Sequence, residues 1–179
     1  MPDTLSGHEA ITSPADRRLA VGKVPGRPIT FRTRAAYLPL FLRLGVLLDQ
    51  VIQLHRDDSW SYAYRQARMG SGVSDHAGYA VDVWTSREGA TGWPTRMTAA
   101  QAKQIARILE TFQTSDGRHV FGWGAVSAGG YTGPHYTRTA NSDPMHFYIA
   151  PGITVRDAVN VRRRMGIRTD GTVARLRAA

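Results

Sequence analysis

A chain of 179 residues with 42% hydrophobic and 21% charged residues has the length and composition of one globular domain, which argues against a disordered protein. It contains no cysteine, so disulfides, thiolate nucleophiles and thiolate metal sites are excluded, and a metal would need imidazole or carboxylate ligands. The net charge of +9 suits an anionic partner, but its sign alone does not choose among nucleic acid, anionic lipid and cell-wall polymer.

The N-terminal segment, residues 1–30, is rich in Pro, Gly, Thr and Ser and shows no sustained hydrophobic period. We therefore expect an irregular arm that contributes little to the core. The segment also lacks an apolar run followed by a small-residue cleavage site. We expect no signal peptide, and hence synthesis in the cytoplasm without one.

A helix is predicted within residues 34–54, entered around Pro39. Apolar residues recur there at steps of three and four, as at Leu40, Leu44 and Leu48. This is also the most apolar stretch of the chain, but charged and polar residues interrupt it and would be costly in hydrocarbon. We expect a buried core helix and no membrane span.

The segment GYAVDVW alternates in polarity, which predicts a half-buried strand with its valines on one face and Asp82 on the other. Farther along, Thr98 is followed three positions later by Gln101, the pattern of a capping box. It predicts a second helix that runs to about Phe112.

A turn is expected at Asp116 and Gly117. After it, VFGWGAV resembles a short strand, and residues 127–142 resemble a long loop of the kind that usually serves a site. The segment MHFYIA alternates again and places His146 on the face opposite Phe147.

A third helix is predicted from Val155 to about Met165, with Thr154 as its N-cap and Gly166 as its stop. From Arg156 onward seven arginines oppose two aspartates, so residues 154–179 are expected to form a basic helix and tail. This tail is a candidate surface for anionic cell-wall polymers, and the alternative is a solvated face that keeps the protein soluble.

A hydrolytic zinc site needs three protein ligands and one open position at which water becomes acidic. Of the six histidines, only His76 and His146 lie beside an acid in a strand-like context. The six-residue gap from His76 to Asp82 excludes the one-helix-face geometry of H-E-x-x-H, so these ligands would come from a loop and the strand that follows it.

These residues carry a resemblance to a known family. S-x-H followed by A-G-x-A-x-D, and later D-x-M-H-F, resemble the zinc D-alanyl-D-alanine carboxypeptidase and L-alanyl-D-glutamate endopeptidase family, which includes phage endolysins and vancomycin-resistance carboxypeptidases. WSYAYR, TAAQAKQIARIL and a WG pair extend the similarity over about residues 34–150. The resemblance implies a hedgehog-like α+β fold: a small antiparallel sheet flanked by helices, with zinc at one end of the sheet. The catalytic domain would span residues 31–153.

The resemblance also implies roles for individual residues. The zinc ligands would be His76, Asp82 and His146. Asp143 would be the catalytic acid and base, and Arg65 would polarise the scissile carbonyl, with Arg68 as a rival for that role. Many relatives have Glu in place of Asp143, which has a shorter reach, and the loop at residues 129–141 has no counterpart. Candidate substrate contacts are Ser74, Trp123, Tyr131 and His135, although core packing is the alternative for Trp123.

The function expected from these features is zinc-dependent hydrolysis of a peptide bond in peptidoglycan stem peptides. The ligands are common to L-Ala–D-Glu endopeptidases and D-Ala–D-Ala carboxypeptidases, so the bond stays open. Small size, basicity and the missing signal peptide suggest a phage endolysin released through a holin pore. The alternative is a catalytically silent, zinc-containing wall-binding module. A nucleic-acid-binding role rests on charge alone and is not expected.

Overall fold

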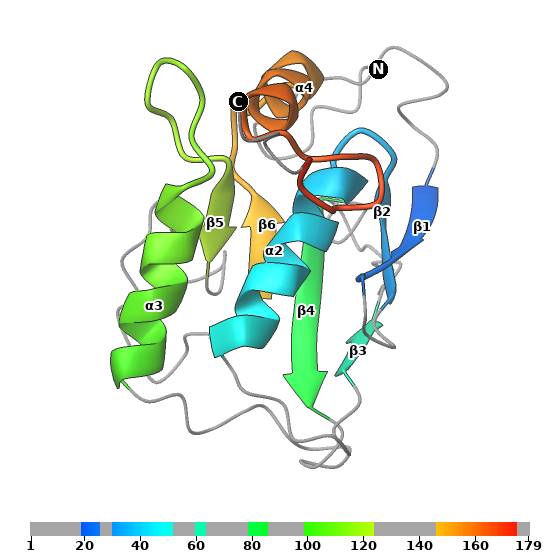
Figure 1. Cartoon of the computed structure of the whole chain (residues 1–179), viewed down its shortest axis with the longest axis vertical. Coiled ribbons are helices and arrows are strands. Elements are labelled where there is room, and N and C mark those ends of the chain that lie inside the picture. The colour runs from blue at the N-terminus through cyan, green and yellow to red at the C-terminus, as the bar shows by residue number, and fades with distance from the viewer. Residues whose placement is uncertain are drawn as a thin grey trace, which may run out of the picture.

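A computed structural model describes residues 19–25, 30–51, 60–63, 79–85, 99–123 and 146–174 (Figure 1). This part of the chain mixes helices with antiparallel strands, so the expected α+β class is confirmed. The strands are β1 (Leu19–Lys23), β2 (Thr30–Arg34), β3 (Trp60–Ala63), β4 (Ala80–Thr85), β5 (Phe121–Trp123) and β6 (His146–Ile149). The helices are α2 (Leu38–Val51), α3 (Ala99–Glu110) and α4 (Val155–Arg164).

The strands form two small sheets. β1 and β2 make an antiparallel hairpin, and the other four strands form an antiparallel sheet in the order β3-β4-β6-β5. The central pair of this sheet comes from distant parts of the sequence, since β4 pairs with β6 and both α3 and β5 lie between them in the chain.

The hydrophobic core lies between the four-stranded sheet and the helices α2 and α3, both of which lie on the same side of that sheet (Figure 1). Within this core, Phe121 of β5 contacts two other aromatic rings. Its ring centroid lies 5.1 Å from that of Phe41 on α2 and 5.0 Å from that of Phe112, just after α3. All three residues are at most 1% exposed. The alternating and helical periods expected for these segments therefore meet in one core.

The end of β2 is joined to the four-stranded sheet through Tyr79, the residue before β4. The guanidinium carbon of Arg34 lies 4.9 Å from the centroid of the Tyr79 ring, and the ring centroids of Tyr37 and Tyr79 are 5.7 Å apart. The backbone carbonyl of Tyr79 also accepts a hydrogen bond from the amide of Ile149. These contacts place the hairpin beside the sheet, at the end where β6 finishes.

One expectation about the N-terminal segment was wrong. Residues 19–23 are not irregular but form β1, and Val24 is fully buried in the core. The signal was hidden because the strand is short and contains Gly22. That glycine permits close packing, since an added Cβ would lie 2.7 Å from Cδ1 of Leu42 on α2.

The third predicted helix is confirmed as α4. Thr154 is its N-cap in a complete capping box with Asp157, and Gly166 follows it with φ +65°. The expected basic tail is not separate from the domain, because Val161 of α4 and Ile167 beyond it belong to the core. Within the residues described, none of the helices is long and apolar enough to cross a membrane.

Candidate metal centre

Two of the three predicted zinc ligands are placed on neighbouring strands. Asp82 is the third residue of β4 and His146 is the first residue of β6, and the antiparallel register pairs them directly. Directly opposed residues of an antiparallel pair share one face of the sheet, and their Cβ atoms lie about 4.5–5.5 Å apart. Two segments far apart in the sequence thus bring one carboxylate and one imidazole residue together.

The register also shows which face of the sheet carries this pair. Phe147, the next residue after His146, is opposite Val81 on one side and Trp123 on the other. Phe121 lies on that same face, two residues before Trp123, and it contacts α2. Asp82 and His146 alternate with these residues, so they lie on the face turned away from α2, as their sequence patterns predicted.

The chemistry of this donor set fits zinc. Imidazole nitrogen and carboxylate oxygen both bind zinc at about 2.0–2.2 Å, so two residues at this Cβ separation are spaced to share one ion. A third ligand is required, and the predicted one, His76, lies outside the described residues. Within the ranges that the structure describes, there is no group of three potential ligands.

Most of the other predicted site residues also fall outside the described part of the chain. They are Arg65, Arg68, Ser74, Tyr131, His135 and Asp143. Two of them are close in sequence to strand residues at or beside the Asp82–His146 pair. Ala63, the last residue of β3, is opposite Asp82 and precedes Arg65 by two positions, while Asp143 precedes β6 by three. Their roles stay predictions.

Trp123, a candidate substrate contact, packs in the core. It is 1% exposed, and its ring stacks on that of Phe147 with centroids 6.0 Å apart, on the face opposite Asp82 and His146. The alternative considered from the sequence, core packing, is the one observed. The alternation of VFGWGAV placed Trp123 with Phe121, so the pattern contained this signal.

One feature of the site face was missed by the sequence analysis. Tyr148 lies two residues after His146 on the same face, is 2% exposed, and is opposite Gly122 of β5. A Cβ added to Gly122 would overlap the Tyr148 ring, so the ring lies directly over the glycine. A glycine inside a strand often marks such a close approach, which is the signal that could have revealed it.

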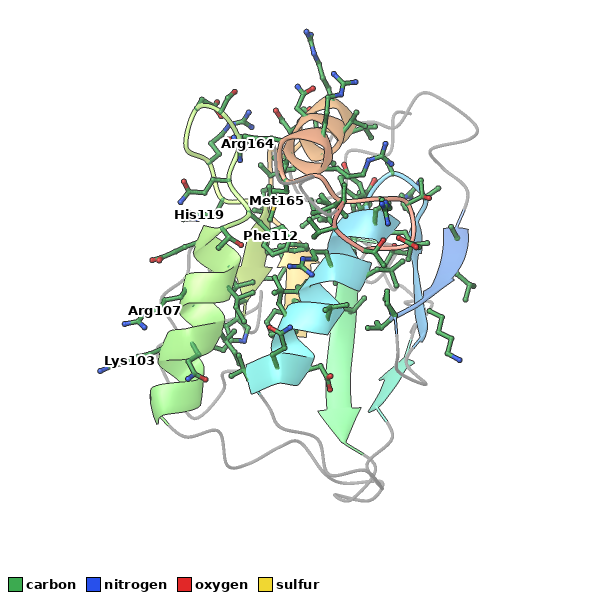
Figure 2. All side chains as sticks on the ribbon, viewed as in Figure 1. Lys103, Arg107, Phe112, His119, Arg164 and Met165 are labelled. Atoms are coloured by element: carbon green, nitrogen blue, oxygen red, sulfur yellow. The ribbon has the colours of Figure 1, made fainter. Side chains whose placement is uncertain are left out.

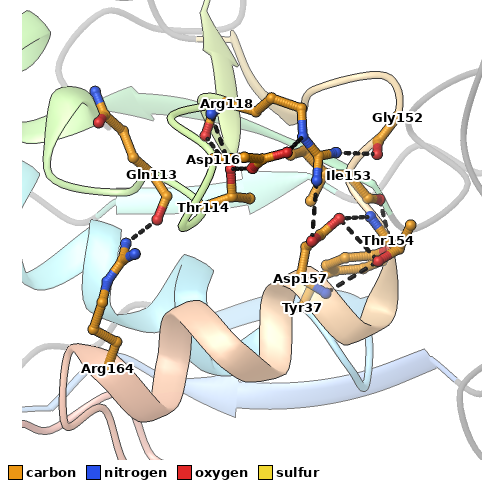
Figure 3. A network of polar contacts seen from close by, with 10 residues as sticks. All are labelled: Tyr37, Gln113, Thr114, Asp116, Arg118, Gly152, Ile153, Thr154, Asp157 and Arg164. Atoms are coloured by element: carbon orange, nitrogen blue, oxygen red, sulfur yellow. Dashed lines mark hydrogen bonds and ion pairs between the residues drawn. The ribbon is translucent and has the colours of Figure 1, made fainter.

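Within the described residues, a cluster of charged hydrogen bonds lies near the N-terminus of α4 (Figure 3). Arg118, in the turn before β5, donates to Asp116 at 2.8 Å, to Asp157 at 3.2 Å and to the carbonyl of Gly152 at 2.8 Å. The hydroxyl of Thr114 also donates to Asp116. That bond, together with the Arg118 contact, lowers the pKa of Asp116 to about 2.

The Asp157 carboxylate completes the capping box of α4. It accepts from the backbone amide of Thr154 at 3.0 Å and from its hydroxyl at 2.9 Å. Partial burial acts to raise the pKa of Asp157, but the Thr154 hydrogen bonds and the charge of Arg118 outweigh it, so the pKa is lowered. This cluster joins the turn to α4 and is not itself a metal site.

No protein-family model matches the chain, and comparisons with curated proteins and with solved structures found no significant match. The features of this chain that bear on its function are therefore its sequence motifs and the register that pairs Asp82 with His146.

Proposed function

We propose that this chain is a zinc-dependent peptidase that cleaves a peptide bond in peptidoglycan stem peptides. The observation that carries the proposal is the pairing of Asp82 with His146 on adjacent strands, on the face of the sheet opposite α2. The motifs around both residues and their order along the chain support it. We also propose that the α+β arrangement is of the hedgehog and D-Ala-D-Ala peptidase type.

In this proposal the ion is held by His76, Asp82 and His146. A bound zinc ion would supply Lewis acidity and make water nucleophilic near neutral pH. Asp143 would take a proton from the attacking water and pass it to the leaving amine as the amide C–N bond breaks. Arg65, or its rival Arg68, would stabilise the negative charge that develops on the carbonyl oxygen.

The biological setting that we propose is a phage endolysin that is made in the cytoplasm and reaches the wall through a holin pore. The substrate is the stem peptide, cut either between L-Ala and D-Glu or between D-Ala and D-Ala. Ser74, Tyr131 and His135 are the proposed substrate contacts. A catalytically silent wall-binding module would have the same ligands but would release no fragment.

The test combines metal analysis with mass spectrometry of digested peptidoglycan. We expect purified wild-type chain to hold about one zinc ion and to release fragments with a newly exposed terminus, whose mass identifies the bond. His146→Ala should lose both the metal and the cleavage, because it removes one of the three ligands. Asp143→Asn should keep the metal and lose cleavage, because the proton acceptor is gone.

The chain offers a matched control in His119, which lies in the turn before β5 and outside the proposed ligand set (Figure 2). His119→Gln should keep zinc and activity. Zinc retained by His146→Ala at wild-type stoichiometry would contradict the metal site. Zinc bound by the wild type without any fragment released would favour the silent module instead.

A further inference from the structure

The acidic side chains around α4 are occupied by internal partners. Asp116 and Asp157 are held by Arg118 and by neighbouring threonines (Figure 3). Asp170, in the loop after α4, accepts bonds from the amide of Thr172 at 2.9 Å and from its hydroxyl at 2.6 Å. These carboxylates therefore already have partners within the protein, and their hydrogen bonds and ion pairs stabilise the turns and the start of α4.

Most arginines of the same region have no ion pair with a carboxylate among the described residues. Arg156, Arg163 and Arg168 are exposed and Arg162 is half-buried, and none of them has a carboxylate in ion-pair contact in the part of the chain that the structure describes. Arg164 donates to the carbonyl of Gln113, a neutral partner that leaves its charge unopposed (Figure 3). By helix geometry Arg156, Arg163 and Arg164 fall within about 100° of the circumference of α4, whereas Arg162 lies on another side. These three residues are here called the α4 arginine surface.

This surface is presented by a firmly anchored helix. Ala158 and Val161 are at most 1% exposed and fix the inner side of α4, while the capping box fixes its start. Arg156 and Arg163 are seven residues apart, which is two turns, so they lie on one side of the helix about 10 Å apart along its axis. Two guanidinium groups in a row on a rigid helix can contact successive charges of an extended polymer.

The surface is also separate from the proposed metal centre. β6 begins at His146, opposite Asp82, and the chain then continues along β6 away from this pair. It enters α4 only afterwards, and α4 lies at one end of the molecule (Figure 1). A polymer bound on α4 would therefore leave the site face of the sheet free.

We propose that the α4 arginine surface binds a phosphodiester-linked anionic polymer of the bacterial wall and so holds the enzyme on its substrate. This inference rests on the proposed function for the identity of the polymer. Phosphate chemistry fits this surface because every charged group of the surface is a guanidinium, which pairs with phosphate in a bidentate fork. Single-stranded nucleic acid is disfavoured because α4 has no aromatic residue on which bases could stack, and duplex DNA is an outcome that the test distinguishes.

The test uses the full-length chain and poly(glycerol phosphate) as the probe, with binding measured by calorimetry between ~50 mM and ~0.2 M salt. Arg156→Gln/Arg163→Gln removes two charges from the surface. Lys103→Gln/Arg107→Gln is the matched control, because both side chains are exposed on α3 and extend from a different side of the molecule (Figure 2). We expect the α4 variant to lose on the order of tenfold or more in affinity at low salt, with a salt slope lower by about two. The α3 variant should bind like the wild type.

Three results would overturn the inference: no binding of the polymer by the wild type, an equal loss in both double variants, or duplex DNA bound as tightly as poly(glycerol phosphate) at equal phosphate concentration. The second result would mean that net charge alone drives binding. Because binding is measured without turnover, failure of the proposed peptidase activity is a separate outcome. His146→Ala should bind the polymer like the wild type even when cleavage is lost.

Discussion

Tyr148 and Gly122 face each other across β6 and β5 on the same side of the sheet as the proposed ligands. The tyrosine ring covers the glycine so closely that an added Cβ would overlap the ring. Because Tyr148 is only 2% exposed, the ring cannot give way without disturbing its packing. The size of residue 122 thus controls how β5 sits against the strand that carries His146.

Gly122→Ala should therefore destabilise the protein, by about 1–3 kcal/mol, as expected for overpacking of a closely packed position. The measurement is urea unfolding followed by tryptophan fluorescence. In the background of Tyr148→Leu, which removes the ring, the same glycine substitution should cost much less, and the difference is the coupling between the two residues. Equal costs in both backgrounds would refute the ring contact.

Each proposed ligand strand was predictable at the residue scale, but the pairing was not. Alternation in GYAVDVW and MHFYIA indicated that Asp82 and His146 lie away from the core side. Which strand neighbours which, and in which register, depends on packing between segments far apart in the chain, and local patterns do not record it. The register pairs the two residues directly on adjacent strands, and their sharing of one metal ion stays a prediction.

At the scale of elements, the turn before β5 and the start of α4 are joined by charged hydrogen bonds. The predictable parts were local: the Thr154 cap, the turn at Gly117 with φ +84°, and the period of α2. The hairpin formed by β1 and β2 was not predicted, because its strands are short and contain or adjoin turn-forming residues. The hydrogen-bond network around Arg118 was not predicted either, because it joins residues that are far apart in the sequence and meet only in the folded chain.

Asp116 makes this junction sensitive to acid. Its pKa is lowered from 3.8 to about 2, mainly by the hydrogen bond from the Thr114 hydroxyl and, to a smaller extent, by the hydrogen bond from Arg118. A carboxyl whose pKa is depressed in the folded state stabilises the fold fully above its unfolded pKa, and this contribution is lost as the pH falls from about 4 to about 2.

The titration of Asp116, followed by carbon NMR of the side-chain carboxyl, should therefore have its midpoint near pH 2. Thr114→Val should move the midpoint upward because it removes the largest cause of the shift, whereas Ser115→Ala, an exposed neighbour, should leave it unchanged. Asp116→Asn should show a smaller loss of stability than the wild type between about pH 4 and pH 2. A midpoint near 3.8 in the wild type would count against the Thr114 and Arg118 contacts.

At the scale of the whole molecule, the segment that follows β6 is part of the core. We expected residues 31–153 to be the catalytic domain and residues 154–179 a basic helix and tail. In the structure the hydroxyl of Tyr37 donates to the carbonyl of Ile153 at 3.3 Å, and Val161 and Ile167 belong to the same hydrophobic core as the buried residues of α2. Gly171 lies so close to α2 that an added Cβ would be 2.5 Å from Cβ of Leu42. The exposed charged residues of this segment are available to bind a partner, while its apolar residues pack in the core and stabilise the fold.

These two roles predict different outcomes for two changes. A chain ending at residue 153 loses the apolar residues of α4 and of the loop after it, and fully burying each large aliphatic side chain contributes about 1.5–3 kcal/mol. Since a domain of this size is stable by only about 5–15 kcal/mol, the truncated chain should lose cooperative thermal unfolding and its near-UV circular dichroism. Arg156→Gln/Arg163→Gln in the full-length chain should keep both signals, because these exposed arginines have no ion-pair partner in the described part of the protein to lose. A truncated chain that melts cooperatively at the wild-type Tm would show that the C-terminal segment is an appendage and not a part of the core.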